Sequence, residues 1–213
     1  KENFSRAMQD VYQQTKCPFV IIIDEWDCIF REYRENHEAQ EQYLDFLRDF
    51  LKDKAYIHLA YMTGILPIKK YGTHSALNMF DEFSMTNPGP LAEFVGFTEE
   101  EVAALCKQYG RNLSELKEWY DGYRFGKTDV YCPWDVINLC DDLRADEDAY
   151  PQNYWSNTSG NAIVRRLIDK ADSVTKNEVE SLIAGDEVIK EIHQELTYSE
   201  LDQSIENLWS VLY

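Results

Sequence analysis

A run of five apolar residues, four of them β-branched, occupies positions 19–23. Such a run is typical of a strand that is buried on both faces of a parallel sheet. Residues 37–53 then carry apolar side chains at helical spacing, and residues 55–62 form a second strand-like pattern. A strand, a helix and a second strand in this order predict a βαβ unit with parallel strands and a right-handed crossover.

Shorter patterns flank this unit. Residues 2–15 have helical spacing, and residues 81–85 have the composition of a third, short strand. Helix-start signals and helical spacing then predict helices at 98–109, 112–119, 134–140, 162–169, 176–184 and 198–212, a turn or hairpin at 120–131 and an acidic loop at 141–148. The change of pattern near residue 95 divides the chain into an α/β part over residues 1–95 and a mainly helical part over residues 96–213.

Charge and cysteine content narrow the function classes. Thirty-nine acidic against 21 basic residues give a net charge of −18, which argues against direct binding of nucleic acid and of anionic membranes. No apolar run approaches the roughly 20 residues that a membrane helix needs. The five cysteines are irregularly spaced and include no CxxC pair, so we expect free thiols in a reducing cytoplasm.

The chemistry-bearing residues follow the first predicted strand. Asp24 and Glu25 come directly after residues 19–23, and ligands of open α/β sheets bind at the carboxyl ends of strands. Successive side chains point in opposite directions, so the two carboxylates serve different roles. One can hold Mg²⁺ through water while the other activates a water molecule, as at a Walker B site. The alternative is structural: two acids that stabilise the start of a following helix.

Thr63 stands at the end of the second predicted strand, where some P-loop ATPases place a polar side chain that contacts the attacking water or the γ-phosphate. Residues 126–128 read Gly-Lys-Thr and resemble the end of a phosphate-binding loop. However, a phosphate loop requires a glycine five positions before Gly126, and this chain has Asp121 there. No strand precedes the segment either, so we interpret it as a turn. The sequence thus has a candidate Walker B strand and no Walker A loop.

Several segments together resemble the predicted AAA-ATPase-like family of bacterial P-loop proteins, which often carry a C-terminal nuclease-like domain of the PD-(D/E)XK type. The resembling segments are residues 20–27, 61–69, 77–78, 96–101, 116–126, 130–133 and 154–160. The W-Y-x-G-Y-x-F-G block within 119–126 and the Tyr-x-Pro that follows it are the most specific. The resemblance implies an α/β fold: a partial P-loop NTPase-type parallel sheet followed by a mainly helical lid region.

The resemblance also implies roles for individual residues. Asp24 would be the nucleotide-site carboxylate that contacts Mg²⁺ through water, Glu25 the water-activating residue and Thr63 the sensor. ATP and Mg²⁺ are expected for the parent protein, and no cofactor is expected to bind this piece tightly. The family's phosphate loop would precede Lys1, and its nuclease-like domain would follow the chain. Residues 187–190 lack the spacing of a nuclease site.

The chain begins at Lys1 and stops within an apolar pattern, so we expect the middle part of an ATPase-like protein that cannot hydrolyse ATP on its own. A bare sheet edge would favour self-association. The alternative is a non-catalytic nucleotide switch or protein-interaction module. A Mg²⁺ enzyme that uses Asp24, Glu25 and Asp27 without a P-loop is disfavoured, because the basic partners of phosphoryl chemistry are missing. Whether the parent hydrolyses ATP stays open.

Overall fold

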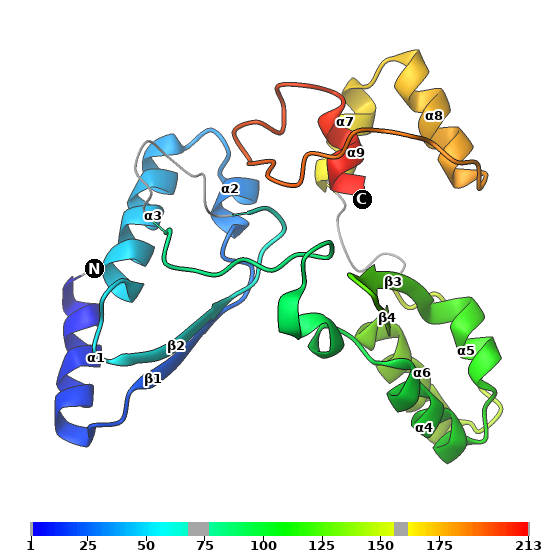
Figure 1. The fold of residues 1–213 in the computed structure, drawn as a ribbon, viewed down its shortest axis with the longest axis horizontal. Coiled ribbons are helices and arrows are strands. Elements are labelled where there is room, and N and C mark those ends of the chain that lie inside the picture. Colours follow the sequence, from blue (N-terminus) through cyan, green and yellow to red (C-terminus); the bar gives the residue numbers. More distant parts are fainter. Residues whose placement is uncertain (1, 68–76, 156–161, 213) are drawn as a thin grey trace. The chain divides into compact units, whose positions relative to one another are not determined.

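The chain consists of helices and two pairs of short strands (Figure 1). The computed structural model describes residues 2–67, 77–155 and 162–212. The elements are α1 (Glu2–Thr15), β1 (Phe19–Ile23), α2 (Cys28–Glu32), α3 (His37–Leu51), β2 (Ile57–Met62), the 3₁₀ helix η1 (Gly89–Phe94), α4 (Glu99–Tyr109), α5 (Leu113–Tyr120), β3 (Asp121–Phe125), β4 (Thr128–Tyr131), α6 (Pro133–Ala145), α7 (Ala162–Lys170), α8 (Ser173–Ile183) and α9 (Asn207–Leu212). The fold therefore mixes helix and strand and contains a small parallel sheet.

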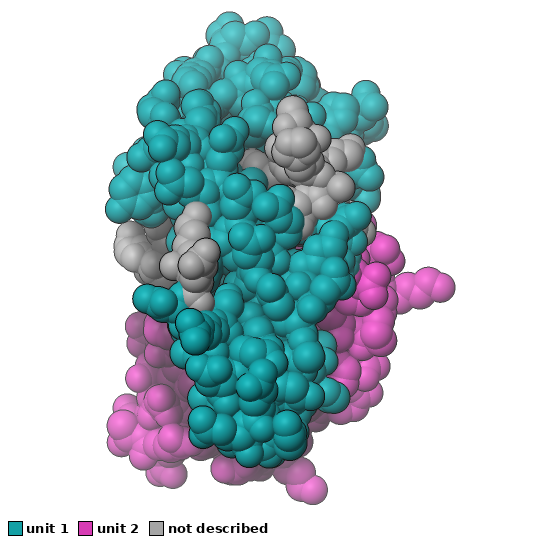
Figure 2. Space-filling model, turned by 90° about the vertical axis from the view of Figure 1, so that its left-hand side faces the viewer, with its two compact units in different colours: residues 1–80, 162–213 teal, residues 81–161 magenta. Residues whose placement is uncertain are grey.

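The chain forms two compact units, coloured separately in Figure 2. Unit 1 comprises residues 1–80 and 162–213, and unit 2 comprises residues 81–161. The helices α7, α8 and α9 thus belong to the same unit as strands β1 and β2, although residues 81–161 separate them in the sequence. The division into domains at residue 95 stays a prediction, since a grouping by proximity does not define domains that fold independently.

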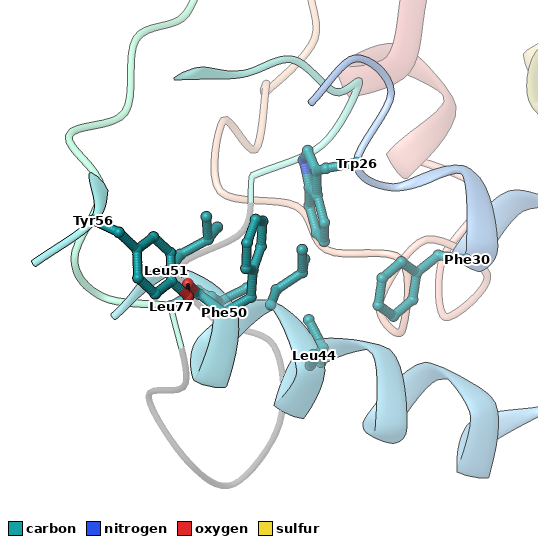
Figure 3. Packing of buried hydrophobic residues seen from close by; sticks show 8 residues of the cluster. Trp26, Phe30, Leu44, Phe50, Leu51, Tyr56 and Leu77 are labelled. Atoms are coloured by element: carbon teal, nitrogen blue, oxygen red, sulfur yellow. Dashed lines mark hydrogen bonds between the residues drawn. The ribbon is translucent and has the colours of Figure 1, made fainter. Parts of the chain in front are cut away.

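The βαβ unit predicted for the N-terminal region is present in unit 1. Strands β1 and β2 pair in parallel, and α3 lies between them in the sequence. Asn36 begins α3 as its N-cap, because its side chain accepts a hydrogen bond from the Ala39 backbone N–H. Eight buried side chains form the core of this region (Figure 3): Trp26, Phe30, Leu44, Leu47, Phe50, Leu51, Tyr56 and Leu77. Four of them come from the apolar side of α3.

The prediction that the first strand is buried on both faces is wrong. One face of the sheet packs on the core, but Val20 and Ile22 are exposed, with 71% of Ile22 accessible. Their partners in the register are Leu59 and Tyr61 of β2, which are also exposed. The physical reason is that the described helices of unit 1 supply a core on one side of β1 and β2, whereas a parallel sheet buried on both faces needs a layer on each.

Unit 2 forms around a second core, built from α4, α5, α6 and β4. Helix α4 begins with the predicted capping box, in which Thr98 and Glu101 satisfy each other's backbone N–H groups. The segment at 120–131, which was predicted to be a turn or a hairpin, is an antiparallel hairpin. Residues 126–127 form its turn, with Gly126 at a φ of +61°. The Gly-Lys-Thr sequence therefore spans the hairpin turn and the first residue of β4, as the prediction of a turn required, and is not a phosphate loop.

Three predicted elements need correction. Residues 81–85 form no strand, because Ser84 and Asn87 bond to each other in a local turn. Helix α6 continues through part of the predicted acidic loop to Ala145, where buried Leu143 anchors its last turn. The C-terminal helix is much shorter than 198–212, because Glu200 accepts hydrogen bonds from Thr197 and holds a turn in place of the first helical residues.

Candidate functional site

The chain makes a tight turn where β1 ends, and this turn is tied to the end of β2. The Thr63 N–H donates to the Ile23 carbonyl at 3.0 Å, and the Trp26 N–H donates to the Thr63 carbonyl at 2.9 Å. Glu25 lies between these bonds with a φ of +51°, an uncommon conformation for a residue other than glycine. Paired backbone bonds on both sides hold this strained residue in place.

The Thr63 hydroxyl joins the three residues that the sequence singled out. It donates a hydrogen bond to Asp24 Oδ1 and accepts one from the Glu25 backbone N–H at 3.0 Å. The structure thus brings Asp24, Glu25 and Thr63 together at the carboxyl ends of two neighbouring parallel strands. Their chemical roles stay predictions.

The Glu25 carboxylate turns toward α2. Its Oε2 accepts from Arg31 Nη2 at 2.7 Å, although 65% of the Glu25 side chain is exposed. Burial lowers the pKa of Arg31, but the bond to Glu25 and the charge of Asp27 outweigh it and raise that pKa above its usual value. The guanidinium therefore stays charged and holds the carboxylate to one side of the turn.

Asp27 is the centre of the turn, a role that the sequence did not reveal. Its side chain is 0% exposed, and its Oδ2 accepts from the Ile65 N–H at 2.8 Å and the Tyr198 hydroxyl at 2.7 Å. The Leu66 N–H lies farther from the same oxygen, at 3.4 Å. No local pattern in the sequence distinguishes this buried acid from the exposed Asp24 and Glu25 that precede it. Asp27 thus fastens the loop after β2 to the turn after β1.

Gly64 allows the two loops to approach. A Cβ atom at this position would lie 2.3 Å from Nε1 of Trp26 and 3.2 Å from the Asp27 carboxyl carbon. Trp26 is itself buried in the core, above α3 (Figure 3). A glycine is therefore required directly after Thr63, because any other side chain would push the loop away from the turn.

The donor set at this turn fits Mg²⁺ held mainly by water. The Asp24 and Glu25 side chains are exposed, and carboxylate oxygens are ligands that Mg²⁺ prefers. Over residues 2–67, 77–155 and 162–212, no three His, Cys, Asp or Glu side chains gather as a metal cage. One carboxylate with a neighbouring hydroxyl suits an ion that keeps several waters and takes its other ligands from phosphates.

The W-Y-x-G-Y-x-F-G block lies apart from this turn in the sequence and belongs to the core and hairpin of unit 2. Tyr120 is buried there and exchanges hydrogen bonds with the Gln152 backbone. Arg124 forms a two-pronged ion pair with Asp129 across the hairpin, at 2.6 and 2.8 Å. This contact holds the pKa of Asp129 below its usual value. These contacts of Tyr120 and Arg124 are structural, whereas Trp119 and Tyr123 of the same block are exposed.

Comparison with known proteins finds a family model that matches the first third of the chain. The model of the family described as "Predicted AAA-ATPase" matches residues 1–73. An uncharacterized protein in the vnfD 5' region of Azotobacter chroococcum mcd 1 is 28% identical over 126 residues, which cover 56% of this chain. The same alignment covers 24% of that relative, so the chain spans about a quarter of its length. No solved structure gives a significant match.

The family match confirms the resemblance seen in the sequence over residues 1–73, which include Asp24, Glu25 and Thr63. The resembling segments after residue 73 lie beyond the match. Residues 68–69 and 156–160 of those segments lie outside the described residues. Separately, none of the helices in the described part of the chain is both long and apolar enough to cross a membrane.

Proposed function

With the AAA-ATPase-like match over residues 1–73 as the premise, we propose that the turn after β1 is the Walker B part of a nucleotide site. Asp24 contacts Mg²⁺ through water, Glu25 orients the attacking water, and Thr63 responds to the γ-phosphate. The observation that carries this proposal is the hydrogen bond from the Thr63 hydroxyl to the Asp24 carboxylate, at the ends of two adjacent parallel strands. Ligands of such sheets bind at this edge.

The bound Mg²⁺ would neutralise charge on the transferred phosphoryl group. The chain's own contribution is to hold the polar atoms in place before the nucleotide arrives. The Thr63 hydroxyl fixes the Asp24 carboxylate, and the backbone bonds between Thr63 and the turn fix the position of Glu25. Preorganised groups of this kind need no rearrangement during the reaction.

The proposed site is incomplete without a phosphate-binding loop. We propose that this loop lies in a segment N-terminal to Lys1. In the same proposal the helical region 96–213 acts as a lid, and a nuclease-like domain follows the chain at its C-terminal end. The exposed apolar face of β1 and β2 supports an additional covering segment, because parallel sheets are normally buried on both sides. On this proposal the chain alone binds neither ATP nor Mg²⁺ tightly and hydrolyses no ATP.

A second function is favoured by one contact. The Glu25 carboxylate is held by Arg31 at 2.7 Å, and a water-activating residue must be available to the water. A protein in which this ion pair persists would bind nucleotide without hydrolysing it. The second candidate is therefore a nucleotide switch or protein-interaction module that uses the same turn.

The first test is nucleotide affinity in the chain extended by the residues that precede Lys1 in its gene. We expect Mg²⁺-dependent binding of a fluorescent ATP analogue by the extended protein and none by the 213-residue chain. Asp24→Asn should weaken binding about tenfold, because it removes the charge that attracts the hydrated ion. The matched control is Asp49→Asn on α3, where the carboxylate is exposed and pairs with Arg48.

Hydrolysis separates the two candidate functions. If the extended protein hydrolyses ATP, Glu25→Gln should lower the rate by about a hundredfold while leaving affinity unchanged. Binding without hydrolysis supports the switch. Binding that is equally strong in Asp24→Asn, or a steady ATPase rate from the 213-residue chain that Glu25→Gln abolishes, would contradict the proposed incomplete Walker B site.

A further inference from the structure

Tyr198 links two parts of unit 1 that are distant in the sequence. Its hydroxyl donates to Asp27 Oδ2 at 2.7 Å, across 171 positions of the chain. Its ring is stacked on Phe30, with centroids 5.9 Å apart and the planes inclined by 14°. The side chain therefore makes a directional contact with the turn after β1 as well as an apolar one with α2.

Tyr198 also packs on two separate hydrophobic clusters. One is the core around α3 that contains Trp26 and Phe30. The other is the C-terminal cluster formed by Ile163, Leu167, Leu196, Leu201 and Leu208. A single residue that borders both clusters is placed to transmit a change in one to the other, because packed side chains adjust in discrete steps.

Asp27 connects Tyr198 to the turn that contains Asp24, Glu25 and Thr63. The oxygen that accepts from Tyr198 also accepts from the Ile65 N–H, two residues after Thr63. The other oxygen, Asp27 Oδ1, is buried without a hydrogen bond and lies 3.7 Å from Arg31 Nε. Since Arg31 holds the Glu25 carboxylate, both the Thr63 loop and Glu25 depend on how Asp27 is oriented.

We propose that Tyr198 is a positioning residue that couples the C-terminal segment 192–212 to the Asp24–Glu25–Thr63 turn. Docking of Tyr198 orients Asp27, and Asp27 in turn holds the loop that carries Thr63. Rearrangement at the turn is thereby communicated to the C-terminal helices, and movement of those helices alters the turn. The inference rests on the proposed function in treating this turn as a nucleotide site, and it assigns that site a regulatory input.

Hydrogen exchange of the 213-residue chain tests this coupling in the absence of nucleotide. Tyr198→Phe keeps the stacked ring and removes only the hydroxyl. We expect exchange of the Ile65 and Leu66 amides to become about tenfold faster, because Asp27 loses the donor that fixes it. Tyr56→Phe is the matched control: it removes a buried hydroxyl bond to the Phe50 carbonyl in the same core and should change these amides less than about twofold.

The reverse direction is measured in Thr63→Val. Coupling between two sites is reciprocal, so loosening the turn should speed exchange of the Leu201 N–H, which bonds to the Thr197 carbonyl. Equal effects of Tyr198→Phe and Tyr56→Phe on Ile65 and Leu66 would overturn the proposal, as would an unchanged Leu201 amide in Thr63→Val. Neither readout depends on nucleotide, so failure of the coupling and failure of the proposed ATPase-like function are separate results.

Discussion

Replacement of Asp27 by alanine is expected to lower the free energy of unfolding, measured at β1 and α3, by about 2–4 kcal/mol. The substitution removes a fully buried carboxylate, which accepts hydrogen bonds from the Ile65 N–H and the Tyr198 hydroxyl. It also leaves the charge of Arg31 with one carboxylate neighbour fewer. Both bonds are partly buried, so each donor that loses its acceptor adds a part of its desolvation cost to the loss of the carboxylate's own packing.

Urea unfolding monitored at amide groups of β1 and α3 measures this loss. Asp45→Ala on α3 is the control, because Asp45 is exposed and pairs with Arg48 one turn away, so a change within about 0.5 kcal/mol is expected. Asp27→Asn should fall between the two variants, since the amide oxygen still accepts a hydrogen bond. A loss below about 1 kcal/mol in Asp27→Ala would contradict the view that Asp27 fastens the two loops.

Gly64→Ala is expected to lower the free energy of unfolding, measured at β1 and α3, by about 3 kcal/mol. The added methyl group would lie 2.3 Å from Trp26 Nε1 and 2.5 Å from its Cδ1. The indole is buried in the core and cannot move aside without disturbing its contacts with Phe30, whose ring centroid lies 5.5 Å away. Either the tryptophan leaves its position or the loop after Thr63 retreats from the turn.

Urea unfolding at β1 and α3 measures this effect. The control, Gly122→Ala, is followed at amide groups of β3 and β4, where that glycine lies. A Cβ atom at Gly122 meets no atom within 4 Å, so that variant should change stability by less than about 0.5 kcal/mol. Gly64→Ala should also break the Thr63–Asp24 bond and shift the amide resonances of the turn. Equal stability of the two variants would show that the loop does not need its close approach to Trp26.

Local pattern was sufficient to predict the βαβ unit and the meeting of its acidic and hydroxyl residues. Strand β1, helix α3 and strand β2 each have a strong pattern of their own, and they occur within three residues of the predicted bounds. Parallel strands place their carboxyl ends on one edge of a sheet, so the proximity of Asp24 and Thr63 followed from the order of elements. The capping box of α4 was equally local, because its two residues lie three positions apart.

Local patterns of this kind do not predict contacts between residues that are far apart in the sequence. Nothing periodic connects Tyr198 to Asp27 across 171 positions, and the turn at 197–203 replaced the expected helix because local side-chain bonds to Glu200 competed with helical ones. The exposed face of β1 was missed for a similar reason. An apolar run of five residues indicates a strand with two apolar faces, but it does not show whether the described elements cover both.

The central claim, that Asp24, Glu25 and Thr63 form one nucleotide site, is tested most directly by locating bound nucleotide on the chain. In the protein extended upstream of Lys1, Mg²⁺ with a non-hydrolysable ATP analogue should shift the backbone amide resonances of these three residues. The shifts should be absent without Mg²⁺ and lost in Asp24→Asn. Saturable nucleotide binding that leaves all three resonances unmoved would contradict the claim.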